Sequence, residues 1–126
     1  MRISDQMSNI LLAMWKAEKD PDSQIGRIMV KRAEVYGASG LATMDLMTFL
    51  KGPLTLDAEG ETRHSVRRSF WRSLKKLLEY DLIRVSSQKK PGTHGYLYGL
   101  TPKGRAKSEE IWAKASMFVE EYSRLL

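Results

Sequence analysis

Residues 62–80 read TRHSVRRSFWRSLKKLLEY and contain the pattern that decides the fold of this chain. Apolar side chains recur there at three- and four-residue steps, the periodicity of an amphipathic α-helix, at Val66, Phe70, Leu74, Leu77 and Leu78. The opposite face is polar and mostly basic, and it carries His64, Ser65, Arg68, Ser69, Arg72, Lys75 and Lys76. We therefore expect a helix over residues 62–80 that packs on its own domain through one face and presents cations on the other.

Three shorter helices are expected before this stretch. The first is capped by Ser4 and ends at the break that begins with Asp20. The second covers residues 23–36 and is followed by the glycine-containing segment 37–40, and the third covers residues 43–50. Residues 54–61 have no clear periodicity and are expected to form a loop.

A β-hairpin and a final helix are expected after it. Residues 82–86 and 96–100 have strand composition, and the segment between them is rich in turn formers. Thr101 followed by Pro102 is a typical helix start, since proline at the first helical position loses no hydrogen bond. The expected fold is mostly α with a small β-hairpin (α+β), in a single domain over residues 1–126 whose residues 102–126 form a long C-terminal helix.

The composition is that of a soluble globular domain. The chain has 126 residues, is 42% hydrophobic and lacks cysteine, so disulfides and thiolate metal sites are excluded and a cytoplasmic location is expected. The early apolar run, residues 10–15, is too short to span a membrane and has no cleavage pattern of a signal peptide. We expect no membrane partner.

The net charge of +6 is unevenly distributed. Residues 63–107 contain twelve Lys or Arg against two acidic residues, a net charge of +10, whereas the rest holds nine basic and thirteen acidic residues, a net charge of −4. A basic block beside a mildly acidic remainder indicates a protein that presents one face to a polyanion. Nucleic acid is the expected partner.

The cationic side chains of the helix and hairpin are the candidate DNA contacts. Arginine can donate two hydrogen bonds to guanine in the major groove, and small serines let a helix approach DNA closely. The candidate residues are Arg63, His64, Ser65, Arg67, Arg68, Arg72, Lys75, Lys76, Lys89, Lys90 and His94. An ordinary solvated helix face is the alternative, but residues 63–76 contain no carboxylate, and an ordinary face mixes both signs of charge.

These segments resemble the winged helix-turn-helix superfamily, especially the MarR-type and PadR-type transcriptional regulators. The resemblance rests on SVRRSFWRSLKKLLEYDLIR at residues 65–84 and YGLTPKGR at residues 98–105. It implies a recognition helix over residues 62–80 and a wing over residues 82–100 that lies against the DNA backbone or minor groove. It also implies base or phosphate contacts from Arg68 and Arg72 and wing contacts from Lys89 and Lys90. The long segment 51–61 departs from the usual short turn, which leaves open which helix is the first of the motif.

The C-terminal helix carries an apolar stripe that is typical of a short oligomer seam. The stripe consists of Ile111, Ala115, Phe118, Tyr122 and Leu125. A homodimer is therefore expected, with coverage of the protein's own core as the alternative. Trp71, Tyr96 and Tyr98 are expected to pack against the domain, and Trp15 and Trp112 are expected in the core, although a pocket for a small effector remains open.

Motifs for catalysis or cofactor binding are not found in the sequence. His64 and His94 are too isolated for a metal site, and Asp57, Glu59 and Glu61 lack the spacing of a calcium loop. We therefore expect sequence-specific binding of double-stranded DNA by a transcriptional regulator, with no catalytic residues, cofactor or metal. The alternatives are a winged-helix module that binds protein or RNA, and a plasmid or viral replication or partition protein.

Overall fold

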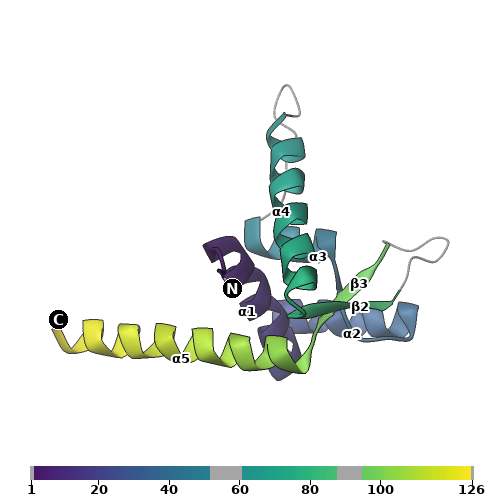
Figure 1. Cartoon of the computed structure of the whole chain (residues 1–126). Coiled ribbons are helices and arrows are strands. Elements are labelled where there is room, and N and C mark those ends of the chain that lie inside the picture. Colours follow the sequence, from purple (N-terminus) through teal and green to yellow (C-terminus); the bar gives the residue numbers. More distant parts are fainter. Residues whose placement is uncertain (1, 52–60, 88–94, 126) are drawn as a thin grey trace.

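The structure, a computed structural model, describes residues 2–51, 61–87 and 95–125, and within them the side-chain environments of residues 2–50, 66–87 and 95–117. These ranges contain five helices and a three-stranded antiparallel sheet (Figure 1). The elements are α1 (Asp5–Lys19), α2 (Gln24–Tyr36), β1 (Leu41–Ala42), α3 (Thr43–Lys51), α4 (Glu61–Glu79), β2 (Ile83–Ser87), β3 (Leu97–Leu100) and α5 (Pro102–Leu125). The predicted α+β class is confirmed. Of the loop expected over residues 54–61, residues 54–60 lie outside the described residues, and the expectation for the last is wrong, because Glu61 is the first residue of α4.

Helices α1 and α2 begin and end where the sequence predicts. The Ser4 hydroxyl accepts a hydrogen bond of 3.2 Å from the backbone N–H of Met7, and the Ser23 hydroxyl accepts one of 3.1 Å from that of Gly26. Each bond satisfies one of the N–H groups that the first helical turn leaves without a partner. Helix α2 ends at Gly37, whose φ of 71° is left-handed and favours glycine.

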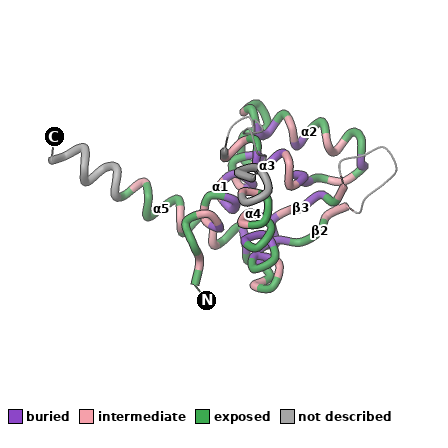
Figure 2. Tube along the Cα trace, turned by 90° about the horizontal axis from the view of Figure 1, so that it is seen from above, coloured by how far each residue is buried: buried purple, intermediate pink, exposed green. Residues whose placement is uncertain are grey.

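Helix α1 lies at the centre of the core. It packs against α2, α3, α4 and α5, and buried residues lie along it (Figure 2). Its Ile10, Leu11 and Met14 are fully buried. Helix α4 contributes Phe70 and Leu74, which are also fully buried. Each such side chain stabilises the fold by roughly 1.5–3 kcal/mol through removal of apolar surface from water. The predicted apolar stripe of α4 is therefore confirmed as the face that holds it on the domain.

The sheet contains one strand that the sequence does not predict. Strand β3 pairs with β2, as the predicted hairpin requires, and also with the two-residue strand β1, so that the order is β1-β3-β2. Gly40 precedes β1, and a Cβ atom placed there would lie 3.0 Å from the Cβ of Leu97 and from the carbonyl oxygen of Tyr98. Glycine thus permits the close approach that lets β1 pair with β3.

A small set of contacts ties the end of α4 to the start of α5. The Thr101 hydroxyl donates a hydrogen bond of 2.5 Å to the carbonyl of Asp81 and accepts one of 3.0 Å from the N–H of Gly104. A Cβ atom on Gly104 would collide with the carbonyl oxygen of Leu82. The Thr-Pro-Lys-Gly segment therefore serves as a helix cap and as a close contact that fixes α5 beside the start of β2.

Helix α5 extends well beyond the other elements (Figure 1). Its first half packs on α1 and β3, and Ile111 is partly buried against the core. Further along, Trp112 and Met117 are 53% and 62% exposed. The predicted C-terminal helix is confirmed, whereas the expectation that Trp112 belongs to the core is wrong, because the helix leaves the body at this point.

Candidate nucleic-acid interface

Helix α4 presents a row of cationic side chains on the face opposite its buried stripe. Phe70, Leu74 and Leu77 are buried on one side. The exposed cations are Arg67, Arg68, Arg72, Lys75 and Lys76. Arg67, which projects toward the apolar stripe on a helical wheel, is exposed as well. The geometry therefore holds these side chains on a rigid helix while leaving their charged groups in solvent.

Among the described residues, the exposed cations of α4 have no acidic partner, whereas four cations elsewhere in the domain do. Among the described residues, salt bridges within 4.0 Å link Arg32 to Asp45, Arg105 to Glu18, and Lys107 and Lys114 to Glu110. The hydrogen bond to Asp45 raises the pKa of Arg32. None of the exposed α4 cations has such a carboxylate in the described part of the chain, so no ion pair occupies their charged groups there.

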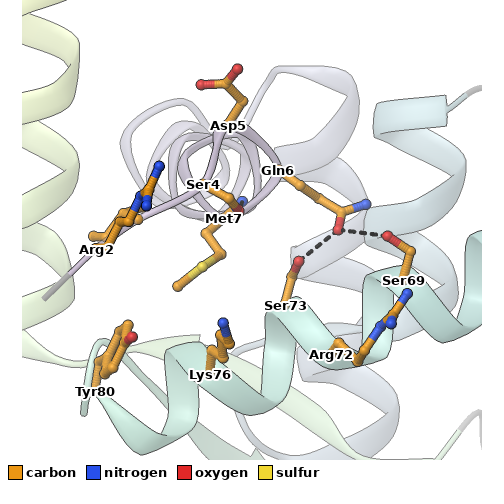
Figure 3. Close-up of a pocket in the computed structure, with 11 residues that line it drawn as sticks. Arg2, Ser4, Asp5, Gln6, Met7, Ser69, Arg72, Ser73, Lys76 and Tyr80 are labelled. Carbon is orange, nitrogen blue, oxygen red and sulfur yellow. Dashed lines mark hydrogen bonds between the residues drawn. The ribbon is translucent and has the colours of Figure 1, made fainter.

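The start of α1 and one side of α4 enclose a groove of about 850 Å³ (Figure 3). Residues 2–7 form one wall, and the other wall consists of Ser69, Arg72, Ser73, Lys76 and Tyr80. The groove is open to solvent and contains three cations, Arg2, Arg72 and Lys76, against one acidic residue, Asp5. It joins the exposed cationic face of α4, because Arg72 and Lys76 belong to both.

Gln6 holds the two walls of this groove together. Its side-chain oxygen accepts hydrogen bonds of 2.6 Å from the Ser73 hydroxyl and 3.3 Å from the Ser69 hydroxyl (Figure 3). The expectation that Ser69 lies on the face that approaches DNA is wrong for its hydroxyl, which donates a hydrogen bond to Gln6 of α1. The two serines are small enough to let α1 lie close to α4 and polar enough to bond with it.

Six of the predicted contact residues lie outside the described side chains. They are Arg63, His64, Ser65, Lys89, Lys90 and His94. The structure therefore assembles the five α4 cations and leaves the predicted contribution of the hairpin tip as an expectation. Arg2, which is not among the predicted contact residues, lines the groove together with Arg72 and Lys76.

Two aromatic residues are more exposed than the sequence predicts. Trp71 is 48% exposed on α4, and Tyr96 is 50% exposed beside β3, whereas Tyr98 is buried as expected. Trp71 lies about 100° around the helix from Phe70, which occupies the buried face. Both exposed rings can therefore contact a partner through a planar apolar surface.

Comparison with family models, curated proteins and solved structures finds no match to this chain. The function is therefore argued from the site alone. In the described residues there is no group of three or more His, Cys, Asp or Glu placed to hold a metal ion. No helix among these residues combines the length and the apolar character needed to cross a membrane.

A second, smaller cavity lies between α1, the end of α3 and α5. It has a volume of about 330 Å³ and is lined mainly by apolar side chains, including Trp15, Phe49 and Trp112. The ring centroids of the two tryptophans are 6.0 Å apart, and the Lys19 ammonium lies 5.6 Å from the centroid of Trp15. Trp15 thus packs partly in the core while also lining this cavity.

The predicted dimer stripe is only partly within the described side chains. Ile111 packs against the protein's own core, as the alternative interpretation expected, and Ala115 is exposed. The side chains of Phe118, Tyr122 and Leu125 lie outside the described ones. Of the predicted stripe, the structure therefore shows one residue packed on the domain and one exposed beyond it.

Proposed function

We propose that this chain is a sequence-specific, double-stranded DNA-binding protein of the winged-helix type that acts as a transcriptional regulator. The observation that carries the proposal is the set of five exposed cations on α4, which have no carboxylate within 4.0 Å among the described residues. Four of them, Arg68, Arg72, Lys75 and Lys76, lie on the side away from the buried stripe. An α-helix fits the major groove, where arginine reads guanine through two hydrogen bonds. Phosphate contacts then supply affinity, and the arginines supply selectivity.

In this proposal α3 and α4 form the helix-turn-helix unit, and the β2–β3 hairpin is the wing. Helix α3 follows β1 directly and packs against both α1 and α4. Helix α4 lies in the major groove with Arg68 and Arg72 directed at base edges. Lys75 and Lys76 contact phosphates, and the hairpin lies along the backbone or in the minor groove. The protein acts by binding alone, without a cofactor, in the cytoplasm.

A homodimer extends the same proposal. The apolar stripe of α5 continues past Ile111 to the exposed Ala115, on a helix that projects from the body (Figure 1). Pairing of this stripe with that of a second copy covers it and places two α4 helices on one duplex. Dimeric proteins of this kind bind half-sites about one helical turn apart.

The proposal is tested by selection of binding sites from a random duplex pool, followed by titration of the selected site. Wild type is expected to enrich a two-fold symmetric motif. Arg68→Ala is expected to relax selectivity at one position of each half-site, where a good arginine–guanine pair contributes about 1–3 kcal/mol of discrimination. Lys75→Ala is expected to weaken all duplexes equally.

Arg27→Ala is the matched control, because Arg27 is exposed on α2 and has no carboxylate within 4.0 Å among the described residues. It is expected to bind like wild type. Enrichment of no motif would reduce the proposal to unselective DNA binding. Binding of an RNA duplex or an acidic protein in place of DNA would instead support an interaction module.

A further inference from the structure

We propose that the groove between the start of α1 and α4 binds a phosphate of the DNA backbone, with Arg2 as a contact from outside the helix-turn-helix unit. This inference rests on the proposed DNA binding and adds a second surface to it. Arg2 is on the α1 wall, whereas Arg72 and Lys76 are on the α4 wall (Figure 3). Cations on two sides of a concave surface are an arrangement suited to a phosphate group.

The charges within the groove favour an anion. Three cations line it against the single carboxylate of Asp5. Asp5 points away from α4 (Figure 3), and within the described residues neither it nor any other carboxylate lies within 4.0 Å of these cations. Arg32 and Arg105, by contrast, each have a carboxylate partner at 2.7 Å. The groove cations therefore keep their hydrogen-bond donors for a ligand.

The position of the groove favours the DNA backbone over a free anion. Arg68, Arg72 and Lys76 follow one another at four-residue steps along α4, about 6 Å per step. The first two are the proposed base contacts, and the last two line the groove. A strand whose bases face Arg68 can therefore continue past Lys76 toward Arg2. The open groove also lets a long polymer enter, which an enclosed anion site would not allow.

Gln6 keeps the α1 wall in place. Its hydrogen bonds to Ser69 and Ser73 join α1 to α4 within the groove itself. Arg2 lies only four residues before this joint, so its guanidinium stays near the surface that contacts DNA. An arginine on an unattached N-terminal segment would lose more conformational freedom on binding.

The test compares the salt dependence of DNA affinity for the wild type, Arg2→Gln and the matched control Arg27→Gln. Loss of one phosphate contact should make the slope of log K against log salt shallower by about 0.9. A variant that matches wild type at 1 M salt should then bind DNA about eightfold more weakly than wild type at 0.1 M salt. The loss should be the same for selected and unrelated duplexes. Arg27→Gln should match wild type, and all three proteins should have the same melting temperature.

The outcomes separate the two proposals. If wild type binds DNA and Arg2→Gln has the wild-type slope, the groove inference is overturned and the proposed function stands. If wild type binds no duplex, both are overturned. Titration of the DNA-free protein with inorganic phosphate distinguishes the sources of the ligand: saturable binding that Arg2→Gln abolishes would assign the groove to a free anion and overturn its assignment to the backbone.

Discussion

The hydroxyl of Ser73 donates a hydrogen bond of 2.6 Å to the side-chain oxygen of Gln6. Ser73 is only 8% exposed, so this bond satisfies a polar group that water reaches poorly. It also joins the first turn of α1 to the middle of α4, the helix that carries the cations. The position of the proposed DNA-binding helix thus depends on a residue near the N-terminus.

Gln6→Ala is expected to destabilise the domain by about 1–3 kcal/mol, because it leaves the buried Ser73 hydroxyl without its partner. Urea denaturation measures the loss, and Gln24→Ala, at an exposed glutamine of α2, is the control. Adding Ser73→Ala to the Gln6→Ala variant should recover part of the lost stability, since the double variant has no buried hydroxyl left without a hydrogen-bond partner. A double variant whose loss is the sum of the two single losses would show that the bond contributes nothing.

Phe70→Ala and Trp71→Ala are expected to have very different effects despite their adjacent positions. Phe70 is fully buried, so truncation should cost about 3–5 kcal/mol of unfolding free energy. Trp71 is 48% exposed, and its truncation should cost less than about 1 kcal/mol. Thermal or urea unfolding of both variants checks this difference, and equal losses would place Trp71 in the core.

Gly104→Ala is expected to destabilise the chain by about 1–3 kcal/mol, because the added methyl group collides with the Leu82 carbonyl. The matched control is Gly99→Ala, since a Cβ atom there would have no neighbour closer than 3.7 Å. Unfolding midpoints should fall for the first variant and change little for the second. The reverse order would mean that the start of α5 is not held against β2 as described.

Ala115→Glu is expected to convert the proposed dimer into monomers by placing a carboxylate on the α5 stripe. Ala113→Glu makes the same change about 160° away around the helix, and Ala113 is also exposed. It should leave the dimer intact. Sedimentation or light scattering gives the masses, and a wild type that stays monomeric at all concentrations contradicts the dimer.

Much of the architecture follows from local sequence signals. Ser4 and Thr101 are predicted as helix caps, and a strong 3.6-residue periodicity predicts α4, because these signals depend on neighbours along the chain. Strand β1 is missed, since two residues carry no periodicity and its pairing with β3 depends on the approach permitted at Gly40. Short strands of this kind are defined by tertiary contacts.

The candidate site is predictable only on α4. Its exposed cations follow from helical periodicity, whereas the groove depends on Gln6 meeting Ser73 across 67 positions of sequence, for which no local signal exists. The exposure of Trp71 is missed for a related reason. Its place at the edge of the apolar arc fits burial or exposure equally well, and only the packing of neighbouring helices decides between them.

The most direct test of the proposed DNA binding is titration of a labelled mixed-sequence duplex with wild type at 0.05 M and 0.2 M salt, followed by fluorescence anisotropy. Three to five phosphate contacts predict saturable binding whose affinity falls roughly 40- to 500-fold between the two concentrations. Absence of binding at 0.05 M, or an affinity that does not change with salt, would contradict the proposal that the exposed cations of α4 bind DNA.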